Sequence, residues 1–256
     1  MATSTPSTGR FVWHELGTND VKQAVRFYSE LFGWKTREQD MGPGFTYTML
    51  KAGDTDVGGI APLDPADKAP PHWRAYCTVP DVDAAARRAA QLGGGVLVPP
   101  TDIPNVGRFA VLVDPQGGVL LPFRSDQPEM PETQGPPPVG TFCWDELMTS
   151  DPVAAVAFYT EIYRWTVTEQ DMGSGGTYRV LKRGDVMTGG IMKLPMPEVP
   201  TYWGAYVAVA NVEATMKRAE SLKAKVIVPP ADIPNMGRFA IFADPAGAVL
   251  AVFQGR

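Results

Sequence analysis

The spacing of apolar residues changes from strand-like to helix-like early in the chain. The segment FVWHEL, residues 11–16, predicts a strand, and the apolar residues after Asp20 recur at helical spacing. Asp20 and Gln23 form a capping box for this helix, and Gly33 is a suitable stop. Short strand candidates separated by glycine-containing turns follow near 35–40, 45–51 and 55–62. This first stretch therefore predicts a βαβββ unit.

The same order of elements is predicted again in the next stretch of the chain. A strand at 73–79 precedes an alanine-rich helix at about 82–92, which three glycines end. The strands predicted after this helix lie near 96–99, 108–113 and 118–123. The second stretch is a second βαβββ unit.

Both units then recur as a tandem repeat. Trp13 recurs as Trp144, and the string GRFA at 107–110 recurs at 237–240. The chain therefore contains four βαβββ units in two copies, an α+β protein.

The segment SDQPEMPETQGPPPVG, residues 125–140, joins the two copies. Its prolines and glycines favour an extended, exposed connection. We predict two modules on either side of it, at residues 1–128 and 139–256.

Composition limits the classes of partner. With 256 residues, 44% of them apolar, the chain can bury a substantial core, and its net charge of −5 without any Lys/Arg run argues against nucleic acid. No apolar run is long enough for a membrane span, and the first ten residues are polar. The two cysteines do not correspond between the copies, which argues against a disulfide framework. We expect a cytoplasmic protein, a monomer or homodimer, with a small molecule as its ligand and neither nucleic acid nor membrane as a partner.

Several motifs carry a resemblance to a known family. Each copy has L-x-T-x-D before a helix that contains FY-x-E-x-x-x-W, and the strand–turn–strand segments DPQG and DPAG follow later. In this order they resemble the vicinal oxygen chelate superfamily of glyoxalases, dioxygenases and bleomycin-binding proteins. The chain is most similar to the two-module glyoxalase-like proteins of actinobacteria, a group that includes a mycobacterial antigen. The resemblance implies that each module forms a cup-shaped mixed sheet.

The resemblance also implies where a catalytic metal would be held, and this chain departs from the family there. No carboxylate stands in 57–63 or 186–194, where one ligand is expected. The other ligand positions fall at Trp13, Arg74 and Leu121, and in the second copy at Trp144, Gly204 and Ala251. Divalent metals need imidazole, carboxylate or thiolate ligands, so we expect neither a metal nor another cofactor.

Two glutamates are the candidate catalytic residues. Strand alternation places Glu15 on the same face as Trp13, and Glu146 on the same face as Trp144. Each carboxylate could bind a ligand or act as a base with a raised pKa, or it could simply pair with a nearby cation or backbone donor. The indoles could stack on a ligand or fill the floor of the cup.

Further residues complete the predicted lining. Arg74 could hold a carboxylate or phosphate, or, as we slightly favour, it could pair with Glu15. His14 and His72 have no matching carboxylates and make a poor metal site. Aromatic residues extend the predicted pocket for a flat or apolar molecule: Tyr47, Tyr76, Phe123, Tyr178, Tyr206 and Phe253.

The repeated loop DIPNxGRFA carries an aspartate and an arginine in each copy. In the first copy these are Asp102 and Arg108. An Asp–Arg pair that braces the loop is favoured over a lid whose arginine contacts the ligand.

Three functions remain open from the sequence. The leading hypothesis is a metal-independent small-molecule-binding protein that sequesters a metabolite or an antibiotic. The second is an enzyme, either a lyase or isomerase of glyoxalase type acting on methylglyoxal adducts, or a metal-free catalyst that uses Glu15 and Glu146. The third is an interaction protein whose cups are vestigial.

Overall fold

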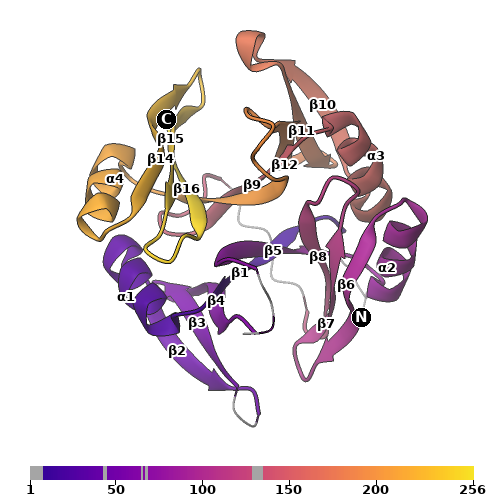
Figure 1. Ribbon diagram of the computed structural model, residues 1–256, viewed down its shortest axis with the longest axis horizontal. Helices are drawn as coiled ribbons and strands as arrows, with labels where there is room; N and C mark the ends of the chain where they lie inside the picture. Colours follow the sequence, from indigo (N-terminus) through magenta and orange to yellow (C-terminus); the bar gives the residue numbers. More distant parts are fainter. Residues whose placement is uncertain (1–7, 43–44, 65, 67–68, 129–134) are drawn as a thin grey trace. The chain divides into compact units, whose positions relative to one another are not determined.

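A computed structural model describes residues 8–42, 45–64, 66, 69–128 and 135–256. The four predicted βαβββ units are confirmed (Figure 1). The first copy contains β1 (Phe11–Thr18), α1 (Val21–Phe32), β2 (Lys35–Asp40), β3 (Thr46–Ala52), β4 (Thr55–Pro62), β5 (His72–Thr78), α2 (Val82–Gln91), β6 (Gly95–Ile103), β7 (Gly107–Val113) and β8 (Val119–Ser125). The second copy contains β9 (Phe142–Thr149), α3 (Pro152–Tyr163), β10 (Thr166–Asp171), the short 3₁₀ helix Gly173–Gly175, β11 (Thr177–Arg183), β12 (Val186–Lys193), β13 (Tyr202–Ala208), α4 (Val212–Ser221), β14 (Lys225–Ile233), β15 (Gly237–Ala243) and β16 (Val249–Gly255).

Each copy contributes one eight-stranded mixed sheet. The strand order is β2-β3-β4-β1-β5-β8-β7-β6 in the first copy and β10-β11-β12-β9-β13-β16-β15-β14 in the second. Strand β1 pairs with β4 in parallel, with Glu15 opposite Gly59, and β9 pairs with β12 in parallel, with Glu146 opposite Gly190. This repeated register fixes which side chains neighbour the two glutamates.

Strand β6 is longer than the sequence pattern predicts. The expected strand near 96–99 continues through two prolines to Ile103. Its pairing with β7 shifts register between Val98 and Thr101, at the prolines. Proline lacks the N–H that a regular ladder needs, and an edge strand with a bulge tolerates it.

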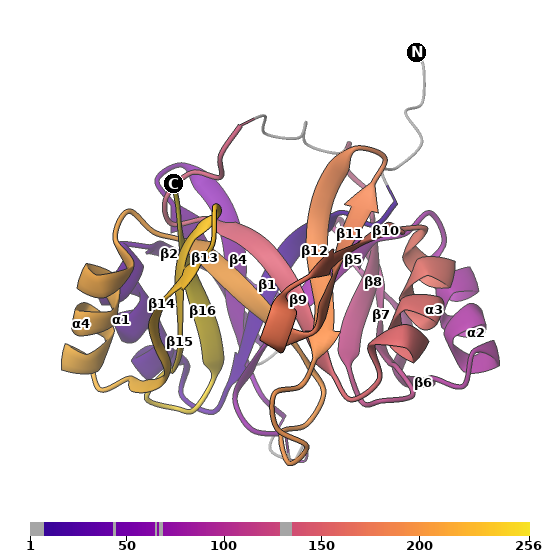
Figure 2. The same ribbon diagram turned by 90° about the horizontal axis from the view of Figure 1, so that it is seen from above.

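The chain packs as two compact units, and each unit combines parts of both copies. Among the described residues, the α2/α3 unit comprises 8–12, 75–128 and 144–203, and the α1/α4 unit comprises those in 13–74, 135–143 and 204–256. Within them α2 packs beside α3, and α1 packs beside α4 (Figure 1, Figure 2). Each unit has its own hydrophobic core, drawn from both copies.

Two equivalent tryptophans, Trp34 and Trp165, form hydrogen bonds that link the two copies within these units. The buried Trp34 indole donates a hydrogen bond to the Gly140 carbonyl at 2.7 Å in the α1/α4 unit. Trp165 donates in the same way to Gly9 at 2.8 Å in the α2/α3 unit. Since each indole is buried, its N–H needs this acceptor.

The buried Tyr28 of α1 and Tyr159 of α3 each form a hydrogen bond with a turn of the other copy. Tyr28 donates to Asp244 at 3.0 Å and accepts from the Trp73 indole at 2.9 Å. Tyr159 donates to the Gly118 carbonyl at 3.2 Å and accepts from Trp203 at 3.0 Å. Burial is the main cause that raises the pKa of both tyrosines, so their hydroxyls stay protonated as donors.

The two ends of α1 follow the sequence signals. Asp20 accepts from the backbone N–H of Gln23 at 2.9 Å, and Gly33 ends α1 in the left-handed region at φ 72°. In the second copy Arg164 occupies the position of Gly33, at φ 56°. None of the helices in the described residues is long and apolar enough to cross a bilayer.

Candidate ligand-binding site

Tryptophan, tyrosine and glutamate gather at equivalent places in the two copies. The first-copy cluster, in the α1/α4 unit, contains Trp13, Glu15, Tyr47 and Arg74. The second-copy cluster, in the α2/α3 unit, contains Trp144, Glu146, Tyr178 and Tyr202. Most of the predicted site residues therefore meet within one unit or the other.

A hydrogen bond between two aromatic side chains defines each cluster. The Trp13 Nε1–H donates to Tyr47 Oη at 2.8 Å, and the Trp144 Nε1–H donates to Tyr178 Oη at the same distance. Because the tyrosine comes from the strand two places away from the tryptophan strand, the bond spans β1 to β3, and β9 to β11. Each pair holds two aromatic rings in a fixed relation.

Glycines on the intervening strands leave room for each tyrosine side chain to extend to its tryptophan. A Cβ added at Gly59 would overlap the Tyr47 hydroxyl, and one added at Gly190 would overlap the Tyr178 hydroxyl. These glycines lie opposite Glu15 and Glu146 in the strand register. The tyrosine therefore passes over the glycine toward the tryptophan and glutamate of the first strand. The sequence prediction missed this role, although both glycines recur in the repeat.

Arg74 forms an ion pair in the first-copy cluster. Its Nη2 lies 2.7 Å from Glu15 Oε1, and the side chains are 24% and 10% exposed. From the sequence, this ion pair was slightly favoured over a contact between Arg74 and a ligand anion, and it is observed. A role of Arg74 or Glu15 toward a ligand stays a prediction.

Two tyrosines interact electrostatically with the glutamate of the second-copy cluster. Burial, followed by the charge of Glu146 and a hydrogen bond to it, raises the pKa of Tyr178. Burial and then Glu146 also raise the pKa of Tyr202. Both hydroxyls therefore stay protonated beside the carboxylate. Tyr202 was not predicted from the sequence, because its counterpart in the first copy is His72 and the repeat gives no signal.

The remaining predicted aromatic residues have phenylalanines as neighbours. In the α2/α3 unit Tyr76 packs against Phe123 edge-on at 6.0 Å between ring centroids. In the α1/α4 unit Tyr206 packs against Phe239, which pairs in register with Phe253. Their place in a ligand site stays a prediction.

The two histidines have other surroundings. His14 is 5% exposed and stacks on Phe142 at 3.8 Å between ring centroids. His72 Nδ1 lies 2.8 Å from the Pro70 carbonyl oxygen. Within the described parts of the chain, no three His, Cys, Asp or Glu side chains are grouped so as to hold a metal ion.

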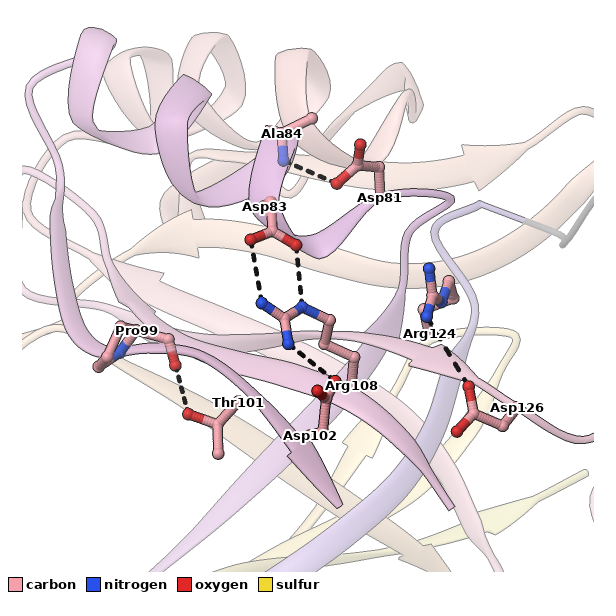
Figure 3. Close-up of polar contacts among 9 residues, drawn as sticks. All are labelled: Asp81, Asp83, Ala84, Pro99, Thr101, Asp102, Arg108, Arg124 and Asp126. Atoms are coloured by element: carbon pink, nitrogen blue, oxygen red, sulfur yellow. Dashed lines mark hydrogen bonds and ion pairs between the residues drawn. The ribbon is translucent and has the colours of Figure 1, made fainter. Parts of the chain in front are cut away.

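The DIPNxGRFA arginine braces its loop (Figure 3). Arg108 contacts Asp83, in the first turn of α2, at 2.9 and 3.0 Å and contacts Asp102 at 2.7 Å. The hydrogen bonds from Arg108 are the largest cause that lowers the pKa of Asp83. Arg238 of the second copy forms ion pairs with Glu213 and Asp232, each at 2.7 Å. The braced loop expected from the sequence is observed, and it extends to the helix.

The fold and these clusters define a protein of two glyoxalase-like modules. A model of the Glyoxalase/Bleomycin resistance protein/Dioxygenase superfamily matches residues 10–123 and 142–252. The chain belongs to this superfamily, as the resemblance in its motifs predicted.

Named relatives span nearly the whole chain. CFP32 from Mycobacterium bovis, a protein named as a glyoxylase, is 37% identical over 249 residues, which cover 94% of this chain and 93% of CFP32. The anthracycline biosynthesis protein DnrV from Streptomyces peucetius is 32% identical over 263 residues, covering 97% of this chain and 94% of DnrV. The Mn(II)-bound glyoxalase from Novosphingobium aromaticivorans shares the fold, with a TM-score of 0.65 and 16% identity over 97% of this chain and 82% of that chain.

The side chains at the implied metal positions do not fit a divalent cation. The Trp13 indole uses its only polar hydrogen toward Tyr47, and the Arg74 guanidinium pairs with Glu15. Leu121 is fully buried and aliphatic. An indole N–H and a guanidinium offer donors but no lone pair for a metal. In this respect the chain departs from the metal-ligand pattern that the resemblance implies.

Proposed function

We propose that this protein binds a small molecule without a metal, with the tryptophan of each cluster as the main contact. The observation that carries the proposal is the indole fixed by its tyrosine beside a glutamate, in both copies. Each indole N–H donates its hydrogen bond to a tyrosine of the protein. A ligand would therefore contact the face of the indole ring.

This arrangement suits a flat or apolar ligand that carries a polar group. An indole face stacks on a planar ring, while a carboxylate or tyrosine hydroxyl fixes its orientation. The relative DnrV is named for anthracycline biosynthesis, and anthracyclines are polycyclic aromatic compounds, which supports a planar ligand class. Binding without turnover would sequester the compound, and sequestration of an antibiotic would confer resistance. We propose that this activity takes place in the cytoplasm, where Cys77 and Cys143, which form no disulfide, would stay reduced.

A second candidate function is glyoxalase-type lyase or isomerase activity. The name of the relative CFP32 supports it, as does the hydrogen bond between Tyr178 and Glu146. Glu15 or Glu146 would serve as a general base toward the substrate. Turnover of the hemithioacetal of methylglyoxal and glutathione by the purified protein would favour this candidate.

A thermal-unfolding screen of aromatic metabolites with the full-length protein tests the binding proposal. A ligand of the folded state raises the apparent unfolding temperature. We expect at least one planar compound to do so, and we expect the double variant Trp13→Ala/Trp144→Ala to lose that shift.

Leu97→Ala is the matched control, since Leu97 is 59% exposed on the edge strand β6. This variant should keep the full shift. A shift that survives in Trp13→Ala/Trp144→Ala would contradict the proposed site, and a hemithioacetal activity abolished by a chelator would contradict the metal-independent binder.

A further inference from the structure

Two methionines lie on the same sheet face as the second-copy cluster. Met148 follows Trp144 and Glu146 at every second position of β9. Met192 follows Gly190 in the same way on β12. Alternate side chains of a strand leave the same face of the sheet, and Met148 and Met192 are Cα partners in the parallel pairing of β9 with β12. The two side chains therefore leave this face next to each other, within the α2/α3 unit.

This face of β9 is partly exposed along its length, whereas the opposite face is buried. Trp144, Glu146 and Met148 are each half-buried. The residues between them, Asp145 and Leu147, are buried. At a rise of about 3.3 Å per residue, the face extends about 13 Å from Trp144 to Met148. A ligand that stacks on the indole can therefore reach the methionines by extending along the strand.

The first copy has small residues at the matched positions and covers them with a leucine. Gly17 pairs with Ala61 in the corresponding register of β1 and β4, and both are buried. A Cβ added at Gly17 would lie 2.7 Å from Leu63 Cδ2. Leu63 and Leu194 occupy equivalent positions, since the N–H of each donates to the last residue of β1 or β9. Leu63 is buried and Leu194 is half-buried, so only the second copy leaves an open apolar surface at this place.

We propose that Met148 and Met192 form an apolar subsite with which the second-copy site binds planar polycyclic ligands longer than naphthalene, whereas the first-copy site accepts only shorter ones. This inference rests on the proposed binding function. One end of the ligand stacks on Trp144, and its far ring lies against the methionines. Methionine suits this role, because its unbranched thioether adapts to the shape of a ligand and makes favourable contacts with aromatic rings.

Fluorescence titration of the full-length protein with 2-naphthol and with 2-anthrol tests the inference. The two probes carry the same hydroxyl group and differ by one fused ring. We expect 2-anthrol to bind to the second-copy site alone. Its binding should therefore be lost in Trp144→Ala and kept in Trp13→Ala, whereas 2-naphthol should still bind to both variants at the remaining cluster.

Substitution of the methionines tests the subsite itself. Met148→Gln/Met192→Gln keeps the length of both side chains but makes them polar, and it should weaken 2-anthrol about tenfold and change 2-naphthol by less than about twofold. Met148→Leu/Met192→Leu keeps the apolar surface and should bind 2-anthrol within about twofold of the wild type. Met192→Gln alone is the milder change if the double glutamine variant fails to fold, and it should weaken 2-anthrol about threefold.

Met187→Gln is the matched control. Met187 is 53% exposed at the beginning of the same strand, β12, and it lies outside the pair of Cα partners. This variant should bind both probes as the wild type does.

The outcomes separate this inference from the proposed function. If 2-naphthol binds but 2-anthrol does not, or if the glutamine variants change both probes equally or neither of them, the methionine subsite is wrong and the binding function stands. The subsite is also wrong if 2-anthrol still binds to Trp144→Ala. If neither probe binds the wild type and the aromatic screen also gives no stabilising compound, the proposed function itself is wrong.

Discussion

The first-copy and second-copy clusters share their geometry and differ in their chemistry. In both, the tryptophan donates to a tyrosine at 2.8 Å, and the tyrosine crosses a glycine that lies opposite the glutamate. Only the first-copy cluster contains an arginine. The repeat thus shows which contacts the fold itself requires and which are free to differ between two sites of one chain.

The largest expected effect on stability comes from removing either of the two buried tryptophans that link the copies, and it should be equal for both. Trp34→Ala and Trp165→Ala each remove a buried indole and leave a carbonyl, of Gly140 or Gly9, without its donor. We expect each to lower the free energy of unfolding by about 3–5 kcal/mol, as removal of a large buried side chain does. Chemical denaturation measures both losses. A small loss for one variant beside a large loss for the other would break the equivalence of the copies.

The glycines beneath the tyrosines should be equally sensitive. Gly59→Ala and Gly190→Ala each place a methyl group against a tyrosine ring, and overpacking of this kind costs about 1–3 kcal/mol. Each variant should also weaken ligand binding at its own cluster alone, measured by titration with the aromatic compound that stabilises the protein in the thermal screen. Loss of binding at both clusters in one variant would show that the two sites are not independent.

The ends of α1 and α3 should respond in opposite directions. Arg164 ends α3 in the left-handed region, which costs a residue with a Cβ about 1–2 kcal/mol, whereas Gly33 ends α1 without that cost. Arg164→Gly should therefore stabilise the protein by about 0.5–1 kcal/mol, and Gly33→Ala should destabilise it by a similar amount. Denaturation midpoints of the two variants check the signs. Destabilisation by Arg164→Gly would mean that its side chain contributes more than its backbone strain costs.

The smallest expected difference concerns pH. Arg108 lowers the pKa of Asp83 in the folded protein below the ordinary aspartate value of 3.8, so the unfolded chain binds this proton more readily. The contribution of Asp83 to stability is present above 3.8 and is lost as the pH falls through the lower folded pKa. Asp83→Asn should therefore show a flatter dependence of unfolding free energy on pH in this acid window. An unchanged slope would show that the Arg108 contact does not bias the titration.

Much of the fold could be predicted because it follows local patterns. The Asp20 cap, the Gly33 stop and strand alternation identified the four βαβββ units from side chains close in sequence. Strand β6 was predicted too short, because a bulge lets its prolines remain in the sheet. The pairing of α1 with α4 could not be predicted, since an apolar stripe specifies a buried face and not the partner that covers it.

The candidate site was predictable to a smaller extent. Alternation alone placed Trp13 beside Glu15, but the bond to Tyr47 depends on the register of three strands. Arg74 was recognised as an ion-pair partner of Glu15. That Arg74 lies near Gly17 could not be predicted, because it depends on the distance between two strands.

The most direct test of metal-independent binding measures metal content and ligand binding on the same sample. The full-length protein would be purified without added metal, its transition metals quantified by elemental analysis, and the stabilising aromatic compound titrated before and after dialysis against EDTA. We predict metal far below one equivalent per chain and the same affinity in both titrations. Near-stoichiometric manganese, zinc, nickel or iron, with binding lost on its removal and restored on its return, would contradict the account.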